Sequence, residues 1–161
     1  MMNMTHYMEL LATNQPWNLI YYMVVPVVLA EVLVGLEFFI VFKRQTTGWL
    51  RTTSKILSII AGAYFTFAIF FPLLFTAIPG MKWRTMVDFI AVWSYLIGVF
   101  PLAGMALLEM GLIGKGKNDQ EKMKLHFILL TIFLVVAHVA MIFGMVNPEI
   151  ITNASGAKMG M

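Results

Sequence analysis

Cysteine is absent from this chain, and charged residues are scarce. Of the 161 residues, 12% are charged and 60% are hydrophobic, whereas a soluble globular domain has about 25% charged and about 45–50% apolar residues. The missing cysteines exclude disulfides, thiolate metal ligands and thiol catalysis. The shortage of charge indicates an integral membrane protein whose main partner is the lipid bilayer, and no basic stripe of the kind that binds nucleic acid is present.

Four apolar runs are long enough to cross a bilayer, which requires about 20 residues in a helix. We expect a single membrane domain over residues 1–161, an all-α four-helix bundle that leaves no room for a soluble enzyme domain. A short surface helix is expected over residues 5–15, where apolar and polar residues are mixed. The predicted spans cover residues 18–42, 50–78, 86–114 and 125–146.

The basic residues predict how the bundle is oriented. Eight Lys and Arg residues flank the first and third connections between spans, and three lie on the opposite side. The positive-inside rule places the larger group in the cytoplasm. Both termini are therefore expected on the non-cytoplasmic side of a bacterial inner membrane. Trp17 and Trp83 would then lie at the outer interface, and Trp49 at the inner one.

Half of the acidic residues lie inside the predicted spans, namely Glu31, Glu37, Asp88 and Glu109. Ionisable groups in a bilayer interior are costly, and they usually face a bundle interior or a proton or ion path. We interpret these four as candidate proton or cation stations. The alternative is that each one only fixes helix contacts through a hydrogen bond, and Glu37 and Asp88 fit an interfacial position best.

Residue spacing predicts which faces turn inward. In the third span a stripe recurs every seven residues, which keeps it on one side of a helix: Asp88, Tyr95, Leu102 and Glu109. The second span carries small residues at a spacing typical of close helix packing: Ser54, Ser58 and Gly62. If the polar faces meet, a polar path runs through the whole bundle. Kinks are expected at three prolines: Pro26, Pro72 and Pro101.

Methionine is abundant, with fourteen residues. In the fourth span His138, Met141 and Met145 are three and four residues apart and share one helical face. Thioether and imidazole ligands select Cu(I) over hard cations. The leading hypothesis is a small permease or metal-binding membrane protein in which these residues hold a copper-like cation, with Glu31 and Glu109 as inner stations. Further candidate metal ligands lie near the amino terminus: Met4, His6 and Met8.

The pair Met141 and Met145, together with the Met-x-Met pattern at the amino terminus, resembles the motifs of the Ctr family of copper importers. The resemblance covers residues 1–8 and 141–145 only. That family has three spans and assembles as a trimer, whereas four spans are predicted here. The resemblance implies that Met141 and Met145 coordinate a copper ion and that the terminal methionines capture it.

A redox function remains open as an alternative. A membrane subunit of a redox complex would hold a b-type haem through axial ligation by His138, or contact a quinone through His138 and Tyr95. His126 lies twelve residues away, about 18 Å along the helix, so the two histidines cannot clamp one haem. Because His126 lies beside Lys124 at the expected membrane edge, we predict a solvated interfacial side chain.

A third alternative is an accessory protein whose buried polar groups only set the helix register. Catalysis is poorly supported by the sequence, because no phosphate loop and no nucleophile–base pair is evident, and we expect a protein that is not itself an enzyme. The large apolar surface is compatible with a homo-oligomer or with a subunit of a larger membrane complex.

Overall fold

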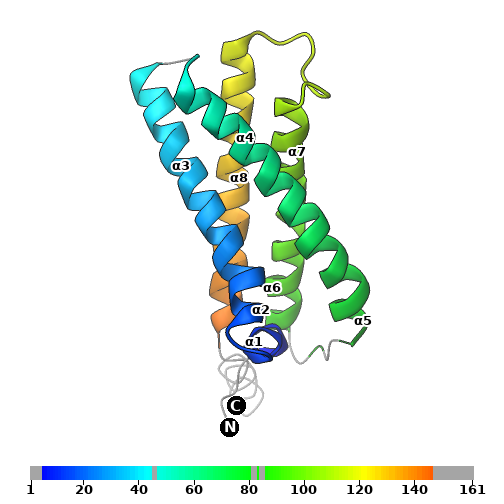
Figure 1. The fold of residues 1–161 in the computed structure, drawn as a ribbon. Helices are drawn as coiled ribbons and strands as arrows, with labels where there is room; N and C mark the ends of the chain where they lie inside the picture. The colour runs from blue at the N-terminus through cyan, green and yellow to red at the C-terminus, as the bar shows by residue number, and fades with distance from the viewer. Residues whose placement is uncertain (1–4, 45–46, 81–82, 84–85, 147–161) are drawn as a thin grey trace, which may run out of the picture.

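The computed structural model describes residues 5–44, 47–80, 83 and 86–146, and it leaves the side chains of positions 6, 7 and 10 undescribed. Every regular element within these residues is helical. Four helical rods pack together as a bundle (Figure 1), and each is long and apolar enough to cross a membrane. The predicted all-α architecture is confirmed, with rods at Trp17–Lys43, Trp49–Gly80, Met86–Glu109 and Asp119–Met145.

The first rod contains α2 (Trp17–Leu19), a π-helical turn η1 (Ile20–Val24) and α3 (Val25–Lys43). Pro26 explains the widened turn, because proline offers no N–H to the carbonyl four residues before it. The short helix α1 (His6–Ala12) precedes this rod, as predicted. Thr5 secures it by donating a 2.7 Å hydrogen bond to the carbonyl oxygen of Gly144, near the end of the last rod.

The second rod contains α4 (Trp49–Ala63), two π-helical segments, η2 (Tyr64–Phe70) and η3 (Leu73–Ala77), and α5 (Ile78–Gly80). The π-helical segments flank Pro72. The third rod contains α6 (Met86–Ile97) and α7 (Val99–Glu109), separated at Gly98, three residues before Pro101. Each of the three predicted kinks is therefore found as a helix irregularity at or just before a proline.

The connection between the third and fourth rods differs from the prediction. The third span was predicted to reach Gly114, but α7 ends at Glu109, because Gly111 and Gly114 adopt left-handed φ values of 75° and 76° that do not continue a helix. The fourth rod, α8 (Asp119–Met145), begins six residues earlier than predicted. Asn118 and Glu121 form a capping box there, in which each side chain accepts a hydrogen bond from the other residue's N–H.

The small-residue stripe of α4 faces the interior of the bundle, as a packing face should, and Ser54, Ser58 and Gly62 are all buried. At Gly62, α4 packs closely against α7. A Cβ atom at Gly62 would lie 2.6 Å from the Cβ of Ala106 and 2.7 Å from the carbonyl oxygen of Leu102. Figure 1 shows α4 crossing obliquely over α7 at this contact. Only glycine permits so close an approach of the two backbones.

The centre of the bundle is apolar. Leu33, Phe65 and Met105 are at most 1% exposed, and Phe65 packs edge to face against Phe133 with ring centroids 5.7 Å apart. The two ends of the bundle differ. One end, here the α1 end, holds α1, the start of the first rod and the end of α8 (Figure 1). The other, the loop end, holds the connections from α3 to α4 and from α7 to α8.

Candidate functional site

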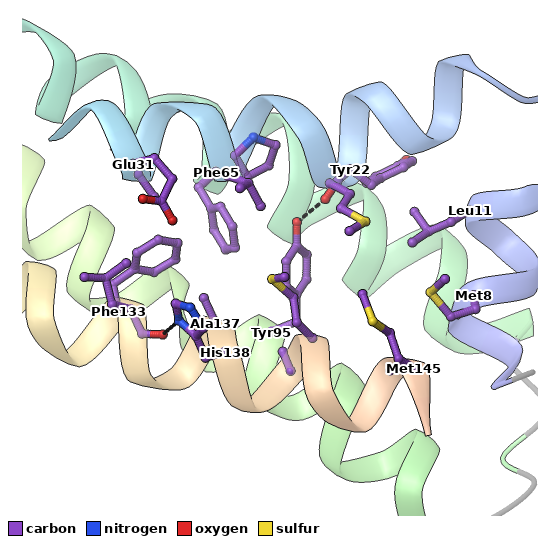
Figure 2. Close-up of a pocket in the computed structure, with 18 residues that line it drawn as sticks. Met8, Leu11, Tyr22, Glu31, Phe65, Tyr95, Phe133, Ala137, His138 and Met145 are labelled. Carbon is purple, nitrogen blue, oxygen red and sulfur yellow. Dashed lines mark hydrogen bonds between the residues drawn. The ribbon is translucent and has the colours of Figure 1, made fainter. Parts of the chain in front are cut away.

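A cavity of about 90 Å³ lies at the α1 end, between the first rod, α8 and α1 (Figure 2). Most of its walls are apolar, and Phe65 and Phe133 are among the lining residues. The walls also include four methionines from three segments. The fold thus brings thioethers that are distant in sequence to one space: Met8 of α1, Met23 of η1, and Met141 and Met145 of α8.

Two ionisable side chains line the same cavity, Glu31 from α3 and His138 from α8 (Figure 2). Both are exposed, and Met145 is 60% exposed, so the cavity opens to the surface of the bundle. The Nδ1 atom of His138 lies 2.7 Å from the carbonyl oxygen of Leu134. Because a carbonyl oxygen can only accept, Nδ1 carries the proton and donates it. In the neutral ring, Nε2 therefore keeps a free lone pair.

The potential ligands form a row along the cavity. Figure 2 shows Glu31 and His138 toward one end and Met8 and Met145 toward the other. His138 and Met145 are seven residues apart, about 10 Å along a helix, so one ion cannot bind both at once. Within the described residues no three His, Asp or Glu side chains gather as a metal site. A metal in this cavity would therefore depend on thioether ligands.

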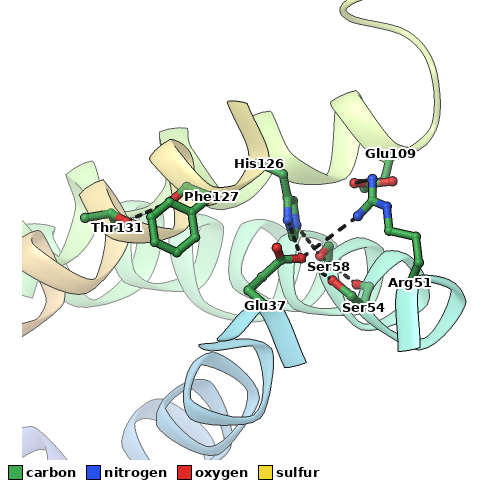
Figure 3. Close-up of polar contacts among 8 residues, drawn as sticks. All are labelled: Glu37, Arg51, Ser54, Ser58, Glu109, His126, Phe127 and Thr131. Carbon is green, nitrogen blue, oxygen red and sulfur yellow. Dashed lines mark hydrogen bonds and ion pairs between the residues drawn. The ribbon is translucent and has the colours of Figure 1, made fainter. Parts of the chain in front are cut away.

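A second polar group lies toward the loop end and draws on all four rods (Figure 3). We call it the polar cluster. Its two serines, its histidine and one of its carboxylates are fully buried at 0% exposure, and Glu109 is 7% exposed. The members are Glu37 of α3, Arg51, Ser54 and Ser58 of α4, Glu109 of α7 and His126 of α8.

Glu37 is the centre of the polar cluster. Its Oε1 atom accepts a 2.7 Å hydrogen bond from the Ser54 hydroxyl and lies 2.8 Å from Nδ1 of His126. The imidazole is turned so that this contact is a close charge contact rather than an aligned hydrogen bond. Arg51 lies 4.0 Å from the same oxygen. The carboxylate thus receives one hydroxyl and two cationic or potentially cationic neighbours.

Arg51 pairs most closely with Glu109, at 2.6 Å between Nη2 and Oε1. Arg51 lies in the first turn of α4 and Glu109 is the last residue of α7. Each charge has the sign that its own helix dipole disfavours at that end. The ion pair offsets both unfavourable placements and links α4 to α7 near the loop end.

Two tyrosine hydroxyls satisfy the backbone around Pro26. Tyr64 donates to the carbonyl oxygen of Tyr21 at 2.9 Å, and Tyr95 donates to the carbonyl oxygen of Tyr22. These are the carbonyls that the π-helical turn and the missing proline N–H leave without helical donors. Tyr95, which the quinone alternative would use, therefore has a structural role in this fold.

The polar path predicted through the bundle is replaced by two separate groups. Along each of three rods, a buried apolar residue lies about one turn from the polar cluster on the side of the cavity, namely Leu33 in α3, Ala61 in α4 and Leu130 in α8. These residues belong to the central core, with Phe65 and Phe133 beyond them. The four predicted acidic stations consequently do not share one space.

Several predicted positions need correction. Glu37 and Asp88, expected near the membrane interface, are both 0% exposed within the bundle. His126 was expected to be solvated and is also 0% exposed, because Glu37 and Ser58 enclose its two ring nitrogens. Asp88 lies in the first turn of α6, where the helix dipole favours an acidic group. Glu109 is buried as the inward stripe predicted, paired with Arg51.

The amino-terminal ligand prediction is only partly covered by the structure. Met8 lines the cavity as a capture residue would. Met4 lies outside the described residues, and the side chain of His6 lies outside what the structure describes. On α8, His138, Met141 and Met145 all line the cavity, but His138 and Met145 lie at its exposed rim rather than deep in the bundle.

Sequence reasoning missed Arg51 and His126 as members of a site. Arg51 was counted only among the basic residues that set orientation, yet it shares a helical face with Ser54 and Ser58 at spacings of three and four residues. The sequence did hold a signal for Arg51. This basic residue continues the serine stripe of the second span at about the depth of Glu37, so it could have been predicted to face the interior.

Comparisons with known proteins do not assign a function to either group. No curated protein matches the chain. No solved structure matches it. A family model described as a family of unknown function, DUF6803, matches residues 2–160. Since the match spans nearly the whole four-rod bundle, this chain belongs to the DUF6803 family.

Proposed function

We propose that this chain is a small membrane protein that binds a soft transition-metal cation of the Cu(I) type in the cavity at the α1 end, as part of its transport. The observation that carries the proposal is the convergence of four methionines on one cavity from three separate segments. Thioethers and imidazole bind Cu(I) in preference to hard ions such as Mg²⁺ or Ca²⁺.

His138 has the hydrogen bonding expected of a metal ligand. Histidine ligands usually donate their second ring N–H to a carbonyl or carboxylate, which fixes the ring and leaves the other nitrogen for the metal. Nδ1 of His138 donates to the carbonyl of Leu134, so Nε2 is the nitrogen free to bind. Met141, one turn away on the same helix, also lines the cavity.

The negative charge of the Glu31 carboxylate also favours a cation in the cavity. Its side chain is exposed near the middle of the Trp17–Lys43 rod, and an ionised carboxylate at mid-span is costly in a bilayer. A bound cation would compensate that charge. In the orientation predicted from the basic residues, an ion would enter past Met8 and Met145 and reach Met141, His138 and Glu31 nearer the middle of the rods.

The cavity size also favours an ion. A volume of about 90 Å³ compares with roughly 30 Å³ for one water molecule and with roughly 300–1,000 Å³ for pockets that bind drug-sized ligands. A haem ligated by His138 stays a prediction, but the cavity would have to enlarge severalfold to admit the macrocycle.

Metal binding is tested by competition of the detergent-purified protein against a chromophoric Cu(I) chelator under reducing conditions. The variant Met141→Leu/Met145→Leu keeps a similar side-chain volume, so the fold should survive, and we expect it to lose Cu(I) binding. The matched control is Met86→Leu/Met110→Leu, which changes two exposed methionines that do not line the cavity and should bind as the parent does.

Undiminished Cu(I) binding in the Met141→Leu/Met145→Leu protein would refute the proposal. A Soret band in the purified parent protein that disappears in His138→Ala would favour the haem alternative instead. Zn²⁺ serves as the comparison ion, because a site built from thioethers should discriminate strongly against it.

A further inference from the structure

The polar cluster contains a buried histidine, His126, whose hydrogen-bond partner Ser58 can bond the ring in its neutral or its protonated state. His126 is 0% exposed. One ring nitrogen faces Glu37 and the other faces Ser58 (Figure 3). A cluster that served only helix packing would gain little from burying a titratable ring beside a carboxylate, because burying charged groups is costly.

The ring nitrogen that faces Glu37, Nδ1, is protonated in both states of His126. Nδ1 lies 2.8 Å from Oε1 of Glu37, and that oxygen already accepts from the Ser54 hydroxyl. Although the ring is turned away from an aligned hydrogen bond, an unprotonated, electron-rich nitrogen so close to a negatively charged oxygen would be repelled electrostatically, whereas an N–H group there is attracted. Nδ1 therefore carries a proton whether the ring is neutral or charged.

The ring nitrogen that faces Ser58, Nε2, can form a hydrogen bond either with or without a proton of its own. The Ser58 hydroxyl oxygen lies 2.7 Å from Nε2 of His126 and also 2.7 Å from the carbonyl oxygen of Ser54. When Nε2 is unprotonated, the hydroxyl can donate to it. When Nε2 carries a proton, it donates to the hydroxyl oxygen, and the hydroxyl turns its own proton to the Ser54 carbonyl. Rotation of one hydroxyl thus serves both states.

The charged groups around His126 do not balance when its ring is neutral. The charged groups that face the site are Glu37 from α3, Arg51 from α4 and Glu109 from α7. On α8 itself, Lys122 is half-buried one turn before His126, and Lys124 is exposed. With a neutral His126, two carboxylates face one guanidinium. With a protonated His126, the buried charges balance, which lowers the cost of holding them out of water.

The polar cluster also leaves buried atoms incompletely satisfied. Among the described residues, Oε2 of Glu37, Nη1 of Arg51 and Nδ1 of His126 are buried without an aligned hydrogen-bond partner. Such unsatisfied buried groups are rare in native structures. Glu37 and His126 therefore keep hydrogen-bonding capacity that helix packing alone does not use.

We propose that His126 and Glu37 form a buried proton-binding site, in which His126 gains and loses one proton at Nε2 while Ser58 reverses its hydrogen bond. The site is separate from the methionine-lined cavity, with an apolar layer between them. It does not depend on the metal proposal, and its test uses no metal.

The test is a pH titration of ¹⁵N-histidine-labelled full-length protein in detergent, followed by NMR. The chain has only three histidines, so His126→Gln assigns the resonance directly. We expect the His126 ring to change reversibly between one and two bound protons while circular dichroism shows an unchanged helical fold. A ring that keeps one protonation state over the entire pH range in which the fold persists would overturn the proposal.

A substitution separates proton binding from mere burial. Glu37→Gln keeps a hydrogen-bond acceptor but removes the charge 2.8 Å from Nδ1. We expect the ratio of doubly to singly protonated His126 at a given pH to fall by about tenfold, because the charged ring loses its close carboxylate partner. Thr52→Ala is the control, because it removes an exposed α4 hydroxyl that bonds only its own helix, and it should leave that ratio unchanged.

Glu109→Gln provides a second variant if Glu37→Gln does not fold. It removes one of the two carboxylates without touching His126, so we expect a smaller decrease in the protonated fraction. Equal protonation of His126 in the parent protein and in whichever of these variants folds would show that the polar cluster does not bind the proton as proposed.

Discussion

Single residues in this protein act mainly through the backbone groups and charges that they satisfy. Pro26 removes one helical donor, and the hydroxyl of Tyr95 replaces it at the carbonyl of Tyr22. Arg51 and Glu109 are unfavourable alone at their helix ends and favourable together. These pairings explain why polar residues persist inside apolar rods without requiring that each one take part in transport.

The pairing of Tyr95 with Pro26 makes a specific prediction. Tyr95→Phe should destabilise the protein by roughly 1–3 kcal/mol, because the carbonyl of Tyr22 loses its donor in a partly buried setting. In a Pro26→Ala background the restored helical N–H can satisfy that carbonyl, so the same substitution should cost clearly less. Unfolding in mixed detergent–SDS micelles measures both differences.

Tyr21→Phe is the matched control for this experiment, because it removes a hydroxyl from an exposed ring in the same turn. It should change the unfolding free energy little. Equal costs of Tyr95→Phe in the two backgrounds would contradict the link between the proline and the tyrosine.

At the scale of helices, the contact between α4 and α7 determines how the polar cluster is assembled. Gly62 lets the two backbones approach, and the same face of α4 presents Ser54 and Ser58 to the interior. The close crossing holds α7 against α4, and Glu109 at its end contacts Arg51. One face of α4 therefore both packs against α7 and contributes polar side chains to the polar cluster.

Two glycine substitutions test this packing. Gly62→Ala places a methyl group 2.6 Å from Ala106 and 2.7 Å from the Leu102 backbone, and we expect a loss of about 1–3 kcal/mol in unfolding free energy, the usual cost of overpacking. Gly35→Ala in α3 has no atom within 4 Å of the new methyl group and should be neutral or stabilise by about 0.5–1 kcal/mol. SDS-induced unfolding of the two variants, side by side, provides the measurement.

A Gly62→Ala protein as stable as the Gly35→Ala protein would show that α4 and α7 do not approach as closely as described. Loss of His126 protonation in Gly62→Ala, with Gly35→Ala unaffected, would in addition connect the helix crossing to the polar cluster.

At the scale of the whole molecule, the two ends of the bundle have different chemistry. The α1 end holds the methionine-lined cavity, and the loop end holds the polar cluster, with the apolar core between them. If the chain translocates a cation, the core must rearrange to connect them, because among the residues that the structure describes no buried polar side chain lies in the layer of Leu33, Ala61 and Leu130.

The orientation of the bundle is open to direct measurement, because the natural chain has no cysteine and any introduced one is unique. The positive-inside rule predicts that the loop end faces the cytoplasm. A membrane-impermeant maleimide added to intact cells should label Trp83→Cys, but should label Thr47→Cys and Gly116→Cys only after the membrane is broken. The opposite labelling pattern would reverse the orientation and place the cavity on the cytoplasmic side.

The sequence alone determined the number of rods, their approximate limits and the positions of their irregularities. These features follow from local chemistry, since run length sets the spans and proline removes a helical donor wherever it stands. The sequence also identified His138, Met141 and Met145 as candidates, because they share one face of one helix.

Tertiary structure decided which polar residues meet. Glu37 and His126, of which His126 was predicted to be solvated, became a buried pair because the bundle brings α3 and α8 within contact distance at these two side chains. Met8 joined Met23 and the α8 methionines in the cavity because Thr5 holds α1 against α8. Contacts between rods depend on crossing angles and rotations that no single helix encodes. The faces of separate helices could therefore be predicted from the sequence, but their partners could not.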